Sequence, residues 1–370
     1  MTFCSAPWTT VQIKNTGEFS YCCVSRDPIG WHYNADSLVK GRQEILQGKI
    51  IQGCKTACFD IGNLFASHKD NMNTMWPIKN KITAELDPRQ VEYIDLRIGN
   101  VCNYTCLMCG ERDSHLWGKI NKNPNPHVSW MREPTKFNKI MNFISDCVNL
   151  KSISLAGGEP FYNKKQLFTL LDNIPCTLDL KFITNVSLCD DEIIQKLNQY
   201  KTGRLHCSID GVNSWNEIQR VKSNWKTVEK NILKFSQELH KDWIIRVVPT
   251  FTVINTLGLY DYLEWFNKKL QMVRQECLFN YTICTQPDYM TLYNLPMAMR
   301  ENVVKKIRSK NYDSQKNMQN LCNAILKDIK PHKNTITKLI KYLDYAEDKL
   351  HVDIYNTIPS LIELKEKIET

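Results

Sequence analysis

The sequence predicts an α/β fold: a partial, open (β/α)6 barrel preceded by an amino-terminal module and followed by a helical region. Three observations carry this prediction. Short β-rich runs alternate with helical patterns over residues 91–284, a hairpin pattern and cysteines fill residues 1–75, and helical patterns alone follow residue 287. Repeated strand–helix units imply a parallel sheet with right-handed crossovers. We therefore expect three domains, at residues 1–75, 90–286 and 287–370.

The central region contains six runs with the composition of buried strands. They are Tyr93–Ile98, Ser152–Ala156, Leu178–Thr184, Leu205–Ile209, Ile244–Thr252 and Leu278–Cys284. Between them, apolar residues recur at the three- and four-residue spacing of a helix with one buried stripe, at 137–149, 164–173, 191–200, 226–239 and 259–270. Six units are too few to close an eight-stranded barrel. The active site of such a barrel lies at the carboxyl ends of its strands.

The amino-terminal region has a different pattern. Residues 9–25 read as two strands joined by Asn-Thr-Gly, which is a hairpin signal. A helix is expected to begin at Asp36 and Ser37 and to lead toward Cys54. Residues 76–90 form a plausible linker to the central region.

The composition is that of an ordinary globular protein, with 42% hydrophobic and 24% charged residues. The chain has no apolar run of membrane-spanning length and no signal-peptide pattern at MTFCSAPWTT, so we expect a cytoplasmic protein without a membrane partner. In a reducing compartment, the clustered members of its fifteen cysteines indicate metal binding or catalysis rather than disulfides. The net charge of +9 is spread along the chain, which favours a solvated surface but leaves nucleic-acid binding open.

Three cysteines follow directly on the first predicted strand. Cys102, Cys106 and Cys109 lie in NVCNYTCLMCG, with three and then two residues between them. Thiolates are the preferred ligands of iron–sulfur clusters. Three thiolates on a four-iron cluster leave one iron open, as a catalytic metal site requires. The alternative is a structural zinc site with His115 as fourth ligand.

Two further motifs end later predicted strands. Residues 153–160 read ISLAGGEP, residues 205–211 read LHCSIDG, and Arg220 follows in NEIQRVKSNW. With the three cysteines, these motifs resemble the radical S-adenosylmethionine (radical SAM) superfamily. The resemblance implies a TIM-like barrel in which SAM chelates the open iron of a [4Fe–4S] cluster and is cleaved by one electron. The resulting 5′-deoxyadenosyl radical then removes a hydrogen atom from a substrate. A flavodoxin- or ferredoxin-like reductant is implied as partner.

The same resemblance assigns the cofactor-binding residues. Gly157 and Gly158 would allow close approach of the backbone to SAM, and Glu159 would accept hydrogen bonds from its ammonium group. The other expected SAM contacts are Thr184, Asn185, Ser208, Asp210, Arg220 and Asn255. The sequence departs from the family pattern at Met108, where an aromatic residue is common, and at Thr-Asn-Val, where relatives have Thr-Asn-Gly. A Gly-Ile-Gly motif is missing from residues 280–287.

A second group of cysteines lies near the amino terminus. Cys4, Cys22, Cys54 and Cys58 have the arrangement of a four-thiolate site, which suits either structural zinc or a [4Fe–4S] cluster. The segment CSAPWTTVQIKNTGEFSYC resembles the SPASM or twitch auxiliary-cluster module, and this resemblance implies a second [4Fe–4S] cluster. Cys23 is then a packed or exposed thiol, because neighbouring strand residues point to opposite faces.

The function expected from these features is oxidoreductase-type radical chemistry on a peptide or protein side chain. By family resemblance, auxiliary-cluster modules of this kind occur most often in enzymes acting on peptides. A nucleotide, nucleic acid or small carbohydrate is the alternative substrate. A non-catalytic zinc or iron–sulfur binding protein is the alternative from another functional class. Residues 110–136 form a long insertion that suits a substrate lid or a plain surface loop.

Overall fold

The structure is a computed structural model that describes residues 3–25, 27, 29–58, 68–78, 82–85, 87–312, 316–329 and 333–369. The fold is mixed α/β, and eight of the described strands belong to a mostly parallel sheet. The α/β class and the strand–helix repeat are therefore confirmed. The chain divides into two compact units: residues 1–101, 127–183 and 199–204 form the first, and residues 102–126, 184–198 and 205–370 form the second. The three predicted domains stay a prediction.

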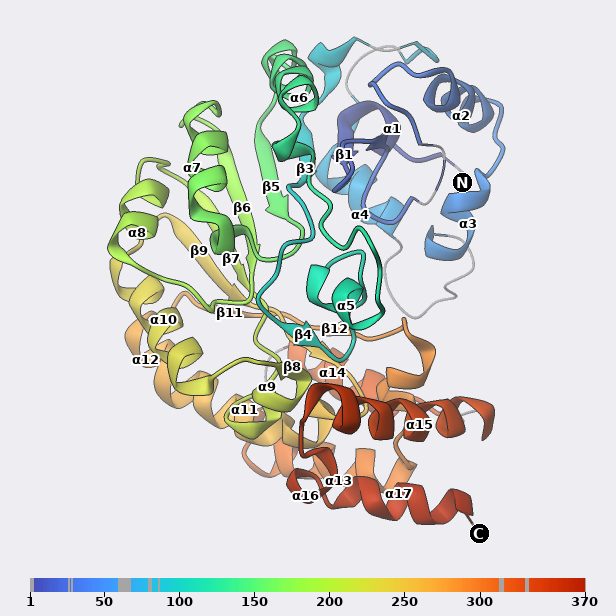
Figure 1. Ribbon diagram of the computed structural model, residues 1–370, viewed down its shortest axis with the longest axis vertical. Helices are drawn as coiled ribbons and strands as arrows, with labels where there is room; N and C mark the ends of the chain where they lie inside the picture. The colour runs from blue at the N-terminus through green and yellow to red at the C-terminus, as the bar shows by residue number, and fades with distance from the viewer. Residues whose placement is uncertain are drawn as a thin grey trace. The chain divides into compact units, whose positions relative to one another are not determined.

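The sheet strands that lie wholly or mainly in the first unit run in the order β2-β1-β3-β5-β6, and β1, β3, β5 and β6 are labelled in Figure 1. Their bounds are β1 Thr10–Ile13, β2 Phe19–Ser20, β3 Tyr93–Arg97, β5 Ser152–Ala156 and β6 Asp179–Thr184. Strands β1 and β2 form the predicted hairpin, and β1 also pairs in parallel with β3. The hairpin therefore extends the parallel sheet as well as carrying the amino-terminal cysteines.

Helices connect and cover these strands. The described α-helices of the first unit are α1 Ala6–Thr9, α2 Asp36–Leu46, α3 Gln52–Cys58, α4 His68–Met75, α6 Pro134–Asp146 and α7 Lys164–Asp172, with 3-10 turns at Pro88–Gln90, Trp130–Arg132 and Pro160–Asn163. The predicted amphipathic stripes of α6 and α7 are buried, as at Ile140, Ile144, Leu167 and Leu170. This burial supplies the main stabilisation of the helices.

Three further sheet strands, in the order β7-β9-β11, lie wholly or mainly in the second unit, which also contains two short strand pairs, β4 with β8 and β10 with β12. Their bounds are β4 Thr105–Cys106, β7 Gly203–Cys207, β8 Arg220–Val221, β9 Trp243–Val247, β10 Thr250–Phe251, β11 Leu278–Phe279 and β12 Thr282–Ile283. The last two predicted strands are each divided in two. The break after β9 contains Pro249, which has no N–H for a strand ladder.

The second unit is otherwise helical. Its α-helices are α5 His115–Ile120, α8 Asp191–Leu197, α9 Ser214–Gln219, α10 Trp225–Glu238, α11 Leu259–Trp265, α12 Gln271–Val273, α13 Met297–Ser309, α14 Lys316–Ile325, α15 Lys333–Leu350, α16 Ile354–Thr357 and α17 Ser360–Glu369. A π-helical turn at Phe266–Leu270 joins α11 to α12, and 3-10 turns lie at Asn255–Gly258, Asp288–Met290 and Leu292–Asn294. The helical character predicted after residue 287 is confirmed.

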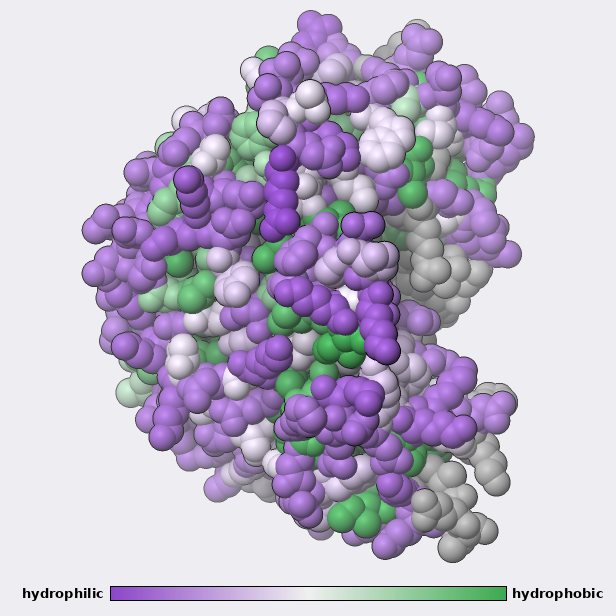
Figure 2. Space-filling view, in the orientation of Figure 1, coloured by the Kyte–Doolittle hydropathy of each residue, from purple (hydrophilic) through white to green (hydrophobic). Residues whose placement is uncertain are grey.

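The surface shown in Figure 2 is mostly hydrophilic, with apolar residues in small separate groups. This pattern agrees with the diffuse charge of the sequence. Among the described helices, none has both the length and the apolar character needed to cross a bilayer.

Candidate active site

The three-cysteine loop lies in the second unit. Cys106 belongs to strand β4 and is paired, antiparallel, with Arg220 of strand β8. The Cys109 N–H donates to the Cys106 carbonyl at 3.0 Å, and the two thiols also contact each other. Cys102 and Cys106 are buried, at 8% and 4% exposure. The fold therefore brings the thiols of this loop into one small region.

A buried ion pair stands beside the loop. The Arg220 Nε lies 2.8 Å from Asp210 Oδ2, and Arg220 Nη1 donates toward Cys106 Sγ at 3.7 Å. Asp210 is fully buried and accepts a hydrogen bond from the Thr250 N–H at 2.8 Å. The arginine therefore places a fixed positive charge against a cysteine sulfur.

These contacts alter the acidity of the groups. Contact with Cys109 lowers the pKa of the Cys106 thiol, and the charge of Arg220 acts in the same direction against the effect of burial. Burial raises the pKa of Asp210, although Arg220 opposes that rise. Burial alone would lower the pKa of Arg220, but Asp210, Cys106 and Cys109 together raise it. Arg220 therefore stays charged, and thiolate character is favoured at Cys106.

Side chains of residues 114–117 hold the backbone of the loop, a role that the sequence did not indicate. The Cys102 N–H donates to His115 Nδ1 at 3.2 Å. This nitrogen could not bind zinc, the alternative considered for His115, without losing that hydrogen bond. Ser114 Oγ donates to the Tyr104 carbonyl at 2.8 Å, and Trp117 Nε1 donates to the Cys106 carbonyl at 3.0 Å. The start of helix α5, within the long insertion, is therefore a support for the loop.

Two more supports come from distant parts of the chain. The Leu107 N–H donates to the Gln219 carbonyl at 2.9 Å, and Tyr342 Oη of helix α15 donates to the Leu107 carbonyl at 2.6 Å. Leu107 packs in a hydrophobic cluster with Leu339 and Leu343 of the same helix. The carboxyl-terminal helical region thus contributes directly to the position of the cysteine loop.

The predicted residues at the end of β6 also contact this loop. Asn185 Nδ2 donates to Asn103 Oδ1 at 2.9 Å and lies 3.9 Å from Cys102 Sγ. Thr184 Oγ1 accepts from the Val186 N–H at 3.0 Å, and the Thr184 carbonyl accepts from the Ser208 N–H at 2.7 Å. Thr184, Asn185 and Ser208 therefore share one set of turns next to Cys102.

Asn255 contacts the backbone of the ion-pair segment. Its Nδ2 donates to the Asp210 carbonyl at 2.8 Å, and its Oδ1 accepts from the Thr252 N–H at 2.7 Å. It is 1% exposed. The structure thus gives Asn255 a positioning role for Asp210, and its contact with SAM stays a prediction.

The Gly-Gly-Glu motif lies in the first unit, against residues 99–101. The Gly158 N–H donates to the Gly99 carbonyl at 2.7 Å, and the Glu159 N–H donates to the Val101 carbonyl at 2.8 Å. A Cβ at Gly158 would lie 2.1 Å from the Val101 oxygen, and Gly157 has a φ of +131°. Both glycines are therefore required by packing and conformation at the segment that leads into Cys102. Glu159 is 3% exposed, and its Oε1 accepts from the Phe161 N–H at 3.2 Å.

The four amino-terminal cysteines are also gathered in the first unit. Cys4 interacts electrostatically with Cys54 and Cys58, and Cys22 interacts with Cys54. Burial raises the pKa of Cys4 to about 12 and also raises the pKa values of Cys22, Cys54 and Cys58. A metal that supplies positive charge would offset this effect. Cys23 also interacts electrostatically with Cys22, and its sulfur lies 3.8 Å from His68 Nε2.

The two groups of cysteines differ from a site for a single metal ion. Within the described ranges, no three Cys, His, Asp or Glu side chains converge closely enough to hold a single metal ion. A cubane cluster does not require such convergence, because each thiolate binds a different iron. Three cysteines on one loop, with a buried cation beside them, fit a [4Fe–4S] cluster. The four clustered amino-terminal thiols fit a second cluster better than zinc, which is a single ion and needs that convergence.

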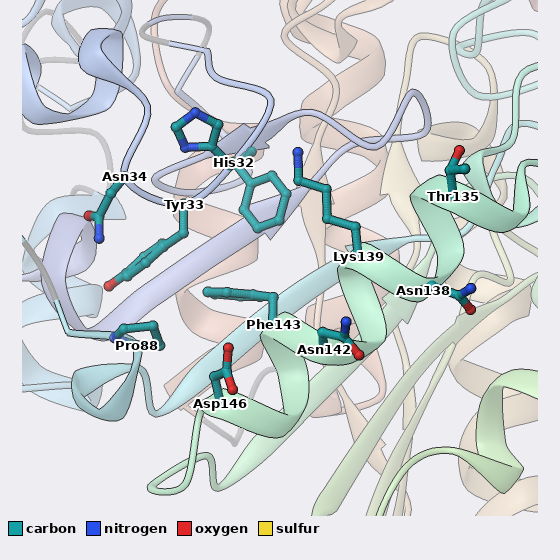
Figure 3. A pocket seen from close by; sticks show the side chains of 11 residues that line it. His32, Tyr33, Asn34, Pro88, Thr135, Asn138, Lys139, Asn142, Phe143 and Asp146 are labelled. Carbon is teal, nitrogen blue, oxygen red and sulfur yellow. The ribbon is translucent and has the colours of Figure 1, made fainter.

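A pocket with a volume of about 580 Å³ also lies in the first unit (Figure 3). Tyr33 and Phe143 form part of its aromatic wall, and Asn34, Asn142 and Asp146 are among its polar lining residues. Its lining includes none of the cofactor or cysteine residues selected from the sequence. Sequence reasoning gave no signal for this pocket, because its residues come from four separate segments.

Comparison with known proteins identifies a family. Residues 96–261 match the family model described as the radical SAM superfamily. A similar curated protein is the radical SAM cyclopropyl synthase TigE of Paramaledivibacter caminithermalis, 22% identical over 207 residues that cover 52% of this chain and 40% of that protein.

Two solved structures have a partial similarity to the chain at low sequence identity. Native anSMEcpe with bound AdoMet is 16% identical, with a TM-score of 0.44 over 60% of this chain and 61% of that one. Streptococcus suis SuiB bound to S-adenosylmethionine is 13% identical, with a TM-score of 0.37 over 59% of this chain and 48% of that one. The chain therefore covers less than two thirds of the length of each of these relatives.

Proposed function

Because the chain belongs to the radical SAM superfamily, we propose that it is an enzyme that cleaves SAM reductively and abstracts a hydrogen atom from a peptide or protein side chain. The observation that carries the proposal is the contact of Arg220 with Cys106, fixed by the buried carboxylate of Asp210. A buried cation held against a sulfur is useful where that sulfur is a thiolate. Such an ion pair is otherwise a costly feature of a protein interior.

Cys102, Cys106 and Cys109 would hold the [4Fe–4S] cluster. When bound, the cluster supplies the electron that cleaves SAM to methionine and a 5′-deoxyadenosyl radical. Arg220 would offset the negative charge of the thiolates, and Tyr342, Trp117 and the other loop supports would keep the three sulfurs in place. Preorganised ligands of this kind lower the reorganisation required during electron transfer.

The cofactor-binding residues would hold SAM in two ways. Glu159 and the backbone around Gly157 and Gly158 would bind its amino group, as the sequence predicts. Ser208 and Asn185 are half-buried or buried polar groups close to the cysteine loop, with hydrogen-bonding capacity for SAM polar groups. The buried surroundings of Cys102 and Cys106 would limit the access of water to the site.

The peptide substrate and the second cluster are part of the same proposal. Cys4, Cys22, Cys54 and Cys58 would hold an auxiliary [4Fe–4S] cluster, and a flavodoxin- or ferredoxin-like protein would supply electrons. Support for a peptide over a nucleic acid comes from charge distribution. The basic excess is diffuse, without a Lys/Arg cluster interleaved with aromatic residues.

The test of SAM cleavage is an anaerobic assay. The reconstituted, reduced protein should convert SAM to 5′-deoxyadenosine and methionine. Cys106→Ala should abolish the product, because a cluster lacking one thiolate does not hold its geometry. Cys322→Ala is the matched control, a cysteine of the second unit that is 1% exposed and packs in a hydrophobic cluster. Normal cleavage by the Cys106 variant would disprove the mechanism.

The substrate class has a separate test. Binding to heparin and to random DNA or RNA is measured across salt concentrations. For a peptide enzyme with a diffuse charge, we expect weak binding to these polyanions and an affinity that changes little with salt concentration. Sub-micromolar affinity that falls steeply with salt concentration would contradict the peptide proposal and favour a nucleotide or nucleic acid as substrate.

A further inference from the structure

One face of the sheet in the first unit is polar from strand to strand. In the paired register, Gln12 lies opposite Asp95, Asp95 opposite Ser154, and Ser154 opposite Lys181. A neighbouring row contains Thr10, Tyr93, Ser152 and Asp179. The alternate positions form the other face and are apolar and almost fully buried: Val11, Ile13, Ile94, Leu96, Ile153, Leu155, Leu180 and Phe182.

This arrangement is unusual for parallel strands. Parallel sheets are normally buried on both faces and read as continuous apolar runs. A row of polar and charged groups on one face is costly to bury unless each group has a partner. Gln12, Asp95 and Ser154 are buried, but 27% of the Arg97 side chain, 29% of Asp179 and 24% of Arg204 are exposed. Water or a polar ligand therefore reaches the partly exposed charged groups of this face.

The charges on this face leave one cation unmatched. Arg97 Nε lies 3.2 Å from Asp95 Oδ1, and Arg204 pairs with Asp179. Lys181 is half-buried and, among the residues that the structure describes, forms neither an ion pair nor a hydrogen bond. Burial lowers the pKa of Lys181, and nearby Arg204 and Arg97 lower it further, while Asp95 opposes the change. An added negative charge would stabilise this lysine.

We propose that the polar face is a binding site for one carboxylate group and that Lys181 is the cation that recognises it. The proposal rests on the proposed function for the carrier of that carboxylate, which is a peptide substrate bearing an acidic side chain or a free carboxyl terminus. One unmatched positive charge corresponds to a monoanion. A phosphate dianion would exceed this charge, and the two nearby arginines, Arg97 and Arg204, are already paired with Asp95 and Asp179.

The surroundings of Lys181 also suit a bound polar ligand. Cys23 interacts electrostatically with Asp95, Arg97 and Lys181, and His68 interacts with Asp95 and Lys181. Burial lowers the pKa of His68, so this imidazole is a neutral hydrogen-bonding group rather than a second cation. The buried Ser154 hydroxyl retains hydrogen-bonding capacity, whereas Gln12 already donates to Asp95 Oδ2 at 2.9 Å and accepts from Ser20 Oγ at 3.2 Å.

The experiment measures the NMR signal of Lys181 during titration with small carboxylates. Lysines of the reconstituted protein are dimethylated with ¹³C, which retains their charge, and the Lys181 signal is assigned from its loss in Lys181→Arg. The probes are N-acetylglutamate N-methylamide, its uncharged isostere N-acetylglutamine N-methylamide, N-acetylalanine and inorganic phosphate. We expect a saturable Lys181 shift with a carboxylate probe, at an affinity at least about tenfold above that of the glutamine probe. The signal of Lys151, which pairs with Glu92, should not move.

The outcomes separate the alternatives. Tighter binding of the glutamate probe supports an acidic side chain, and tighter binding of N-acetylalanine supports a carboxyl terminus. No saturable shift, an equal response to the glutamine probe, or tightest binding of phosphate would overturn the proposal. Lys181→Met should remove binding while leaving the melting temperature equal or higher, because it removes an unmatched, partly buried cation. A large loss of stability would instead assign Lys181 a structural role. Because the titration needs no reductant and no SAM turnover, its failure would leave the proposed SAM cleavage standing.

Discussion

The two groups of cysteines differ in what surrounds their sulfur atoms. Cys106 is held against a buried arginine, and its pKa is lowered. Cys4 and Cys22 are held among apolar side chains such as Ala6 and Met72, and burial raises their pKa values. The protein itself therefore favours thiolate at Cys106, whereas contact with Cys106 and burial raise the pKa of Cys109 in the same group. At the second group, metal must supply the positive charge, so metal binding there is coupled to proton release and local folding.

The largest effect expected from this contrast is at Arg220. Arg220→Met would leave Asp210 buried without its partner, which costs about 3–5 kcal/mol of unfolding free energy. It would also remove the cation beside Cys106 and so reduce SAM cleavage strongly. Denaturant unfolding and the anaerobic cleavage assay measure the two effects. Arg112→Met is the control: this arginine pairs with Asp113, its side chain is 88% exposed, and it should change stability by less than about 1 kcal/mol.

A double variant separates the two roles of Arg220. Asp210→Asn combined with Arg220→Met leaves no unpaired charge and should regain part of the lost stability. Cleavage should stay low, because the cation beside Cys106 is still missing. Recovery of cleavage together with stability would show that Arg220 acts only through the fold.

The second group should behave differently when it loses a thiolate. Cys54→Ala should remove roughly half of about eight irons, the content of two four-iron clusters, while SAM cleavage continues. Iron and sulfide analysis with the 5′-deoxyadenosine assay measures both. The effect on cleavage is expected to be smaller than that of Cys106→Ala because the altered thiolate belongs to the other group. One zinc per protein in place of the second iron set would show that the amino-terminal site is structural.

A smaller effect is expected at the support from helix α15. Tyr342→Phe removes the hydrogen bond to the Leu107 carbonyl and should cost about 1 kcal/mol. The electron paramagnetic resonance spectrum of the reduced cluster should change as the loop loses a restraint. Tyr345→Phe, a 38% exposed tyrosine on the same helix, should alter neither quantity. Identical spectra for the Tyr342 variant and the wild type would show that Tyr342 does not help to position the cysteine loop.

Periodicity predicted the local structure well, because it reports which positions are buried. The strands at residues 93–97 and 152–156 and helix α6 lie where apolar spacing placed them. The pairing of β1 with β3 was not predicted, because a hairpin pattern does not identify a third strand. Contacts across long sequence separations carry no local signal: Tyr342 and Leu107 are 235 residues apart.

Motif resemblance located positions in the candidate site without identifying their partners. Asp210 and Asn255 were expected as cofactor contacts, and the structure shows Asp210 bound to Arg220 and Asn255 bound to backbone near Asp210. The resemblance did not indicate His115 as an acceptor for the Cys102 N–H, since the histidine lies in an insertion outside the motifs. Side-chain partners depend on packing that spacing alone does not determine.

The smallest predicted effect concerns Val186, where the sequence departs from the family's Thr-Asn-Gly pattern. Val186 has a φ of +60° and is fully buried. A left-handed backbone costs a β-branched residue roughly 1–2 kcal/mol, whereas burial of a valine side chain contributes roughly 1.5–3 kcal/mol. Val186→Ala loses the burial and keeps the strain, but Val186→Gly loses the burial and relieves the strain.

The glycine variant should therefore be the more stable of the two by about 1 kcal/mol, although glycine is normally the less stable substitution in regular structure. Denaturant unfolding of both variants measures the difference. An alanine variant that is equally or more stable would show that the left-handed conformation is not retained. Asn185, whose amide donates to Asn103, precedes this residue, so a retained conformation also predicts unchanged SAM cleavage in the glycine variant.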